Sequence, residues 1–221
     1  YQGIDVWRHL VKVCSGLDSF IIGELQVMSQ FRGSISMHNE NGLISDINSS
    51  FFNHIISANR LLRKEFGFNQ TTESMLNLAS NAIEDVLSKE EDSHCVVLGF
   101  GDMGRKAVEV LLSQGQENII VFSRNPSAAS QRDLELSSRI NLLSFDQWEK
   151  QDISPSLIIS TIRNIEPTFN STNVIPIAEP VKIMDFSWPP SIESSAINSE
   201  QELLGMEYWI KVAHKLGVEW D

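Results

Sequence analysis

Apolar residues recur every three or four positions through the first 88 residues of the chain, which is the spacing of one face of an α-helix. Asn41-Gly42 marks a helix end, and Ser45 or Asp46 supplies an N-cap for the helix that follows. The pattern therefore predicts that residues 1–88 are helical. One such apolar face is formed by Trp7, Leu10, Val11 and Cys14.

The pattern changes after a run without any apolar residue at 88–93, which predicts a domain boundary. From His94 onward, short β-branched runs alternate with helical stretches, as in a parallel sheet with crossover helices. We expect strands at Cys95–Phe100, Asn118–Ser123, Asn141–Ser144, Leu157–Thr161 and Val181–Phe186. Helices are expected at Asp102–Ser113 and Ser127–Ser138, and a capping box at Ser199–Glu202 predicts a last helix that ends near Gly217. The fold class is α/β.

Composition narrows the class of protein. The chain has 17 Lys and Arg against 29 Asp and Glu, a formal charge of −12, which argues against gripping nucleic-acid phosphates by bulk charge alone. The hydrophobic share of 42% supports folded domains with cores. Two cysteines cannot make a disulfide framework, so a reducing cytoplasm is expected. The sequence contains no apolar run of about 18 residues, so no membrane-spanning helix is predicted. No metal site is predicted either.

A glycine-rich turn carries the first chemical signal. The run Gly99-Phe100-Gly101-Asp102-Met103-Gly104 follows the first expected strand and opens the first expected helix after it. Glycine at the first position allows a tight turn, at the second it lets a pyrophosphate approach the backbone, and at the third it lets helix and strand pack closely. The pattern predicts a Rossmann-like dinucleotide site, and a tight turn that binds no ligand is the alternative.

The end of the second expected strand indicates which dinucleotide is bound. A free ribose 2′-hydroxyl is usually held by Asp or Glu about 20 residues after the glycines, whereas a 2′-phosphate calls for Arg. Here the chain reads Ser123-Arg124-Asn125, without a carboxylate. Ser123 and Arg124 can donate to a phosphate, so NADPH is favoured over NADH. A solvated arginine in a loop is the alternative.

Further motifs carry a family resemblance. Residues 9–26 read HLVKVCSGLDSFIIGELQ, and Gln30 follows four residues later. Together with RLLRKE at 60–65, the glycine-rich turn, Ser123-Arg124, Ser160-Thr161 and Asp185, this segment resembles glutamyl-tRNA reductases over most of residues 1–190.

The resemblance implies an NADPH-dependent reductase. In that family a cysteine thiolate attacks glutamate esterified to its tRNA, and hydride transfer to the thioester releases glutamate-1-semialdehyde, the first committed intermediate of tetrapyrrole (porphyrin and heme) synthesis. The resemblance also implies glutamyl-tRNA as substrate and a homodimer of the full-length protein. The aminomutase that acts next in the pathway is an expected partner, and no membrane is involved.

The family's site residues map onto the first segment. His9 matches the active-site histidine, and the glutamate pocket corresponds to Ser19, Glu24, Leu25, Gln26 and Gln30. The residues alone leave other interpretations open. A lone helical histidine is more often structural, and Glu24 could instead stabilise a helix N-terminus as a first-turn acid.

The resemblance also suggests a division of the chain. Residues 1–88 would be the helical C-terminal part of the catalytic domain, residues 94–190 the NADP-binding Rossmann domain, and residues 191–221 a helix that leads toward a dimerisation domain. The family's nucleophile lies in a TCNR-like sequence before the histidine, which these residues lack. We therefore expect a fragment without the nucleophile segment and the dimerisation domain, and we expect both Cys14 and Cys95 to be structural.

Three functions are compatible with the sequence. The reductase is favoured because its motifs occur in family order. A non-catalytic relative that binds a nucleotide or regulates is the second, because the nucleophile is missing and Ile162-Arg163 replaces the small residues usual in the family, crowding the nicotinamide position. An unrelated Rossmann dehydrogenase for a small 2-oxo or 2-hydroxy acid ranks last, because His214 is the only histidine beyond residue 140.

Overall fold

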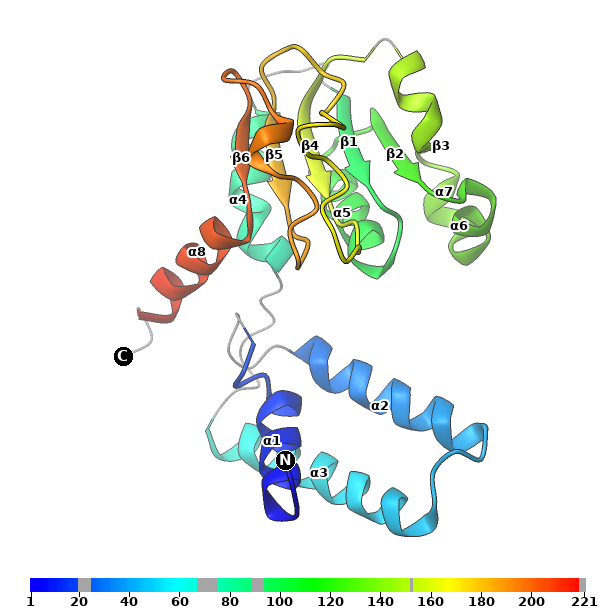
Figure 1. Ribbon diagram of the computed structural model, residues 1–221, viewed down its shortest axis with the longest axis vertical. Coiled ribbons are helices and arrows are strands. Elements are labelled where there is room, and N and C mark those ends of the chain that lie inside the picture. The colour runs from blue at the N-terminus through cyan, green and yellow to red at the C-terminus, as the bar shows by residue number, and fades with distance from the viewer. Residues whose placement is uncertain (20–24, 67–74, 89–93, 152, 219–221) are drawn as a thin grey trace. The chain divides into compact units, whose positions relative to one another are not determined.

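The computed structural model describes residues 1–19, 25–66, 75–88, 94–151 and 153–218 (Figure 1). The chain forms two compact units, Tyr1–Ser74 and Met75–Asp221, called here the helical unit and the sheet unit. Within the described residues, no helix is long and apolar enough to cross a membrane.

The described part of the helical unit consists of three helices, α1 (Ile4–Ser15), α2 (Leu25–Glu40) and α3 (Asp46–Glu65). Their apolar faces meet in a small core that contains Val11, Cys14, Met28 and Ile55. Gly16 ends α1 in the left-handed conformation, with φ of 75°. The Ser45 side chain accepts a hydrogen bond from the Asn48 backbone and so caps α3, as its position predicts.

The sheet unit contains six parallel strands in the order β3-β2-β1-β4-β5-β6. Buried residues dominate β1, β2, β4 and β5, which is typical of a parallel sheet covered on both faces. The strands are β1 (His94–Leu98), β2 (Ile119–Ser123), β3 (Asn141–Ser144), β4 (Pro155–Ser160), β5 (Lys182–Asp185) and β6 (Glu202–Leu204).

Helices cover one face of this sheet, and loops with short helical turns cover the other. Helix α4 contacts α5 and β4, and α5 contacts β1, behind the strands in the view of Figure 1. On the opposite face, Phe169, Ile175 and Ile177 from the β4–β5 connection join the core formed by β1, β2, β4 and β5. The other elements are α4 (Met75–Leu87), α5 (Asp102–Ser113), α6 (Pro126–Arg132), α7 (Leu134–Ser137), η2 (Phe145–Lys150), η3 (Ser194–Ala196) and α8 (Met206–Val218).

The α/β class and its parallel sheet are as expected, but two elements differ. The helix expected over 127–138 is two short helices, because the Asp133 carboxylate accepts a hydrogen bond from Leu136 N (3.0 Å) and caps α7. The capping box expected at Ser199–Glu202 does not start a helix. Instead the buried Gln201 donates to the Ile177 carbonyl oxygen (2.6 Å), and the next three residues form β6 beside β5.

The division between the two units also differs from the boundary expected near residue 88. Helix α4 contacts α5, α8 and β4, so it belongs to the sheet unit, which begins at Met75. At the other end, β6 extends the sheet beyond residue 190. Trp209 is 1% exposed, and its indole N–H donates to the Leu204 carbonyl oxygen (2.9 Å), which holds the start of α8 against β6.

Candidate functional site: a dinucleotide cavity

The turn between β1 and α5 depends on a backbone conformation that favours glycine. Gly99 has φ of +95°, and its N–H donates to the Phe122 carbonyl oxygen (2.8 Å), which holds the turn against β2. A β-carbon at Gly99 would also lie 3.1 Å from the Thr161 Oγ1 atom. The left-handed φ and this close approach both require glycine at the first position of the motif.

The other two glycines have different surroundings. A β-carbon on Gly104 would collide with the carbonyl group of Gly99, so this position lets α5 pack directly against the end of β1. Gly101 has open space, with no heavy atom within 4 Å of an added β-carbon. It precedes the first residue of α5, and no side chain caps that helix. The N–H groups of the first turn of α5 therefore face an open approach, as phosphate binding at a helix start requires.

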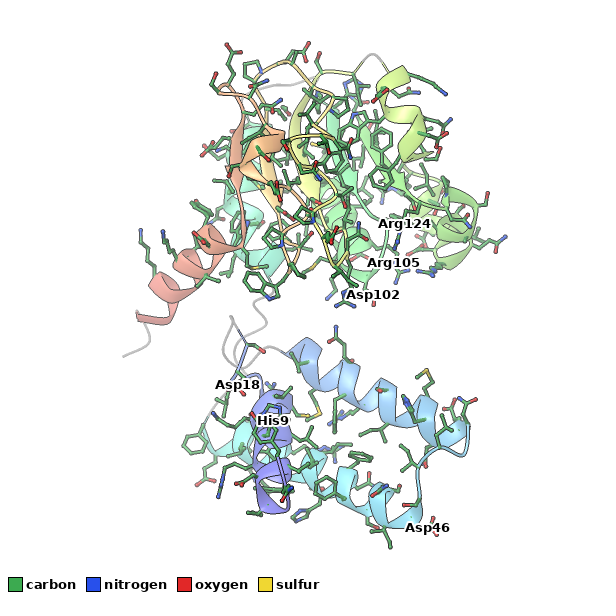
Figure 2. The ribbon with its side chains drawn as sticks, viewed as in Figure 1. His9, Asp18, Asp46, Asp102, Arg105 and Arg124 are labelled. Atoms are coloured by element: carbon green, nitrogen blue, oxygen red, sulfur yellow. The ribbon has the colours of Figure 1, made fainter. Side chains whose placement is uncertain are left out.

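A cavity of about 500 Å³ opens at this turn. It extends along the carboxyl ends of β2, β1 and β4, which share one edge of the sheet because the strands are parallel. Asp102, Arg105 and Arg124 lie at this edge in Figure 2. The cavity, called here the nucleotide cavity, is lined by Gly99, Phe100, Gly101, Ser123, Arg124, Asn125, Ala128, Ala129, Arg132, Phe145, Thr161, Ile162, Arg163, Asn164 and Thr168.

Five of the eight predicted cofactor residues line this cavity, namely Gly99, Phe100, Gly101, Ser123 and Arg124. Asp102, Met103 and Gly104 are not in its wall. The Asp102 side chain is 90% exposed and pairs with Arg105 (Oδ1 to Nη2, 2.6 Å). Met103 lies in the first turn of α5, and Gly104 is buried in the contact with Gly99. Their expected contribution is thus to the shape of the turn and to its backbone donors.

Several lining residues were not predicted as cofactor residues. Thr161 follows β4, and its hydroxyl donates to the Leu98 carbonyl oxygen (3.1 Å), which ties the end of β4 to the glycine turn. Its place directly after a buried strand could have identified Thr161 as a lining residue from the sequence. Asn125 uses its side chain to cap α6, accepting from Ala128 N (3.0 Å). The sequence around Arg132 did not indicate that it lines the cavity, because this depends on where α6 ends.

A buried carboxylate organises the loop after β5. Asp185 is 1% exposed and accepts backbone hydrogen bonds from Ser187 (3.0 Å), Ser191 (2.8 Å) and Ile192 (3.1 Å). The Ser191 hydroxyl also contacts Asp185 (3.0 Å) and the Ser160 hydroxyl at the end of β4 (2.6 Å). This loop carries Trp188, which lines a second, more open cavity together with Arg163 and Asn164. The carboxylate thereby fixes one wall beside the nucleotide cavity.

The predicted residues of the helical unit are only partly described. His9 is half-buried on α1, and its ring stacks on Tyr1 with centroids 4.2 Å apart and planes at 9°. Ser19 is half-buried in the turn after α1, and Gln30 is exposed on α2. Glu24 lies outside the described residues, and nothing is described of the side chains of Leu25 and Gln26 at the start of α2. The glutamate pocket therefore stays a prediction.

Neither cysteine has the character of a nucleophile. Cys14 lies in the core of the helical unit and Cys95 in β1, and both are fully buried. Burial raises the pKa of the Cys14 thiol to about 11 and that of the Cys95 thiol to about 12. Because the thiolate is the reactive form, these cysteines are inert near neutral pH, as expected of structural cysteines.

Comparison with known proteins places the two units. Residues 78–204 match the family model of shikimate / quinate 5-dehydrogenases, so the sheet unit is a dehydrogenase-type Rossmann domain and a nicotinamide cofactor is implied. Residues 1–66 match the N-terminal domain of glutamyl-tRNA(Glu) reductase. The chain belongs to the glutamyl-tRNA reductase family.

Individual relatives agree with this assignment. Glutamyl-tRNA reductase of Thermosipho melanesiensis is 29% identical over 194 residues, covering 88% of this chain and 50% of the relative. That of Saccharolobus islandicus is 27% identical over 201 residues, covering 91% and 45%. The solved glutamyl-tRNA reductase of Methanopyrus kandleri shares the fold, with a TM-score of 0.50 and 20% identity over 97% of this chain and 55% of that one. The chain thus spans about half the length of the curated relatives it matches.

Proposed function

We propose that this chain acts in the NADPH-dependent reduction of glutamyl-tRNA to glutamate-1-semialdehyde, which begins 5-aminolevulinate and porphyrin synthesis. One observation carries the proposal: a segment matching the reductase N-terminal domain precedes a Rossmann unit whose cavity has a glycine turn and arginines in its wall. The fold alone would leave the substrate open, because many dehydrogenases share it.

The cavity fits a nicotinamide dinucleotide. Open space at Gly101 and the uncapped start of α5 suit a pyrophosphate, and Arg124 with Ser123 suits a ribose 2′-phosphate. A bound NADPH would supply hydride to the substrate carbonyl. The role of Thr161 is positional, because its hydroxyl bonds to the Leu98 carbonyl and holds the end of β4 beside the turn. The volume of about 500 Å³ is in the range of small-molecule sites.

The substrate side of the proposal rests on family positions. His9 is proposed as the active-site histidine, with Ser19, Glu24, Leu25, Gln26 and Gln30 around the glutamyl group. The thiol that forms a thioester is assigned to neither Cys14 nor Cys95, because both are buried and their raised pKa values keep them protonated. A homodimer, the aminomutase as partner and a cytoplasmic location belong to the same proposal.

The test measures NADPH oxidation by the whole protein that carries these residues, with glutamyl-tRNA or free glutamate as substrate. We expect oxidation and semialdehyde formation only with glutamyl-tRNA. His9→Ala should abolish the reaction, while His38→Ala, a substitution on α2 outside the proposed site, should not. Full activity of the His9 variant would remove that residue from the mechanism.

A non-catalytic, nucleotide-binding or regulatory relative is the second candidate. The pair Ile162-Arg163 favours it, because both residues line the nucleotide cavity where the family usually has small residues. The same measurement separates the two candidates: a protein that binds NADPH but shows no oxidation dependent on glutamyl-tRNA is the non-catalytic relative. Turnover with glutamyl-tRNA identifies the reductase.

A further inference from the structure

The nucleotide cavity has a charge opposite to that of the chain as a whole. The full sequence has 29 acidic and 17 basic residues. The described residues that line the cavity nevertheless include three arginines, Arg124, Arg132 and Arg163, and neither Asp nor Glu. Such a local excess of positive charge in an acidic protein favours an anionic ligand at this position.

Two of these arginines belong to the same end of the cavity. Arg124 follows β2, and Arg132 is the last residue of α6, the helix that starts directly after the β2 loop. Between them, Ala128 lines the wall one helical turn before Arg132 and on the same helix face. Because alanine has only a methyl side chain, Ala128 occupies little of the cavity along this stretch of its wall.

Nothing in the described part of the chain pairs with either guanidinium. Both side chains belong to exposed residues, and no ion pair or hydrogen bond involves them among the described residues. The acidic residue next to Arg132 along the chain is Asp133, whose carboxylate caps α7 through Leu136 N. By contrast, Arg105 in the same unit is paired with Asp102. Arg124 and Arg132 therefore remain available to bind an anion.

We propose that Arg132 is a second specificity residue for the cofactor's 2′-phosphate, which it binds together with Arg124. This inference rests on the proposed NADPH site. A phosphate monoester carries nearly two negative charges and accepts paired hydrogen bonds from guanidinium groups. One exposed ion pair contributes little, because water and salt screen it. Two arginines that bind the same phosphate give the site its preference for NADP⁺ over NAD⁺. The free 2′-hydroxyl of NAD⁺ has no charge with which either guanidinium group could pair.

The experiment compares the affinity of the 221-residue chain for NADP⁺ and NAD⁺ by calorimetry. Arg132→Ala should weaken NADP⁺ binding on the order of tenfold, about 1.4 kcal/mol, and leave NAD⁺ binding unchanged. Arg124→Ala should act in the same way, and the double variant should bind both cofactors equally. Arg132→Lys should keep part of the preference, because an ammonium group retains the charge without the planar fork.

Arg139→Ala is the matched control, because Arg139 is also exposed but lies outside the cavity. It should leave both affinities unchanged. The ligands 2′,5′-ADP and 5′-AMP differ only in the 2′-phosphate, so comparing their affinities isolates its contribution. Arg132→Ala should weaken binding of 2′,5′-ADP and leave binding of 5′-AMP unchanged. The preference for NADP⁺ should also narrow as ionic strength rises.

The outcomes separate this inference from the proposed function. If the parent chain prefers NADP⁺ but Arg132→Ala leaves that preference intact, or weakens both cofactors equally, Arg132 is not a specificity residue and the NADPH assignment stands. If the parent chain binds NADP⁺ and NAD⁺ equally, or binds neither, the 2′-phosphate assignment fails and this inference fails with it.

Discussion

The Gly99 carbonyl group lies where a β-carbon on Gly104 would have to stand. This close approach packs the start of α5 against the end of β1, so the N-terminus of the helix and the carboxyl end of the strand lie next to each other in the glycine turn. Because Gly104 is buried and Gly101 faces open space, the three glycines of the motif divide between packing and ligand access.

Gly104→Ala should destabilise the sheet unit. The added methyl group collides with backbone rather than with a movable side chain, so α5 must shift, at a cost of about 1–3 kcal/mol in the free energy of unfolding. Urea unfolding measures this loss. Gly205→Ala is the control, because a β-carbon there meets nothing within 4 Å. Gly205 directly precedes α8 and its carbonyl accepts from Tyr208 N, so alanine at this N-cap position should cost no more than about 1 kcal/mol. Equal stability of both variants would show that α5 does not need this close contact.

Asp185→Asn should loosen the loop after β5. The carboxylate accepts four hydrogen bonds from buried donors, including two from Ser191. An asparagine amide would turn an NH₂ group toward some of those donors and leave them without an acceptor. We expect a loss of about 1–3 kcal/mol and faster amide hydrogen exchange at Ser187, Ser191 and Ile192. Glu149→Gln, an exposed substitution in the same unit, should change neither. Unchanged exchange in Asp185→Asn would contradict the role given to the carboxylate.

The cysteines should make stability depend on alkaline pH. Burial raises the pKa values of Cys14 and Cys95 from the ordinary 9.0 to about 11 and about 12. The folded state then holds each thiol proton more tightly than the unfolded state does. This contribution is complete below pH 9 and is lost as the pH rises through 9 toward 11 and 12. For Cys95 the free energy of unfolding should fall by about 1.4 kcal/mol per pH unit in that range.

Urea unfolding at about pH 8 and about pH 10 measures this slope. In Cys95→Ala the free energy of unfolding should fall by less between the two pH values, because the unfolded variant has one thiol fewer to ionise. A thiol reagent at neutral pH should react slowly with the folded chain and quickly in denaturant. Rapid reaction of the folded chain would show that one of the cysteines is accessible.

The glycine turn and the strands around it were predictable because their signals are local. The spacing of Gly99, Gly101 and Gly104 after an apolar run already specifies a strand, a turn and a helix. The break at Asp133 was also visible in principle, because Asp is a strong N-cap residue, but the helical pattern of 127–138 concealed it.

Other features depend on contacts between distant segments. The local capping-box pattern at Ser199–Glu202 is outweighed by the hydrogen bond from Gln201 to Ile177 and by pairing of β6 with β5, both formed with residues far away in the sequence. Arg132 likewise reaches the nucleotide cavity only because α6 ends there. No pattern near either residue in the sequence reports these contacts.

Arg63→Ala should destabilise the helical unit. Arg63 is 5% exposed, and it donates to the Ser15 carbonyl oxygen (Nη2, 3.3 Å) and to Asn59 Oδ1 (Nε, 3.2 Å). Its removal leaves the buried end of α1 without this donor, which should cost about 1–3 kcal/mol. Hydrogen exchange of the last turn of α1 should accelerate. Arg60→Ala on the exposed side of α3 is the control and should leave that exchange unchanged. Similar exchange in both variants would show that the hydrogen bond to Ser15 does not stabilise α1.

Gly101→Ala should separate ligand binding from folding. Gly101 has φ of −77°, which alanine adopts without strain, and a β-carbon there meets nothing within 4 Å. Reduced freedom of the unfolded chain favours alanine, whereas the N-cap position disfavours it, so stability should change by no more than about 1 kcal/mol.

The same methyl group would stand where the proposed pyrophosphate approaches the backbone, so cofactor affinity should fall on the order of tenfold, about 1.4 kcal/mol. Because NADP⁺ and NAD⁺ share the pyrophosphate, Gly101→Ala should weaken both equally, unlike the arginine substitutions, which should weaken NADP⁺ alone. Calorimetry with both cofactors, beside urea unfolding of the same variant, makes the comparison. Parental affinity in Gly101→Ala would mean that the phosphates do not pass this glycine, and the open turn would then need another explanation.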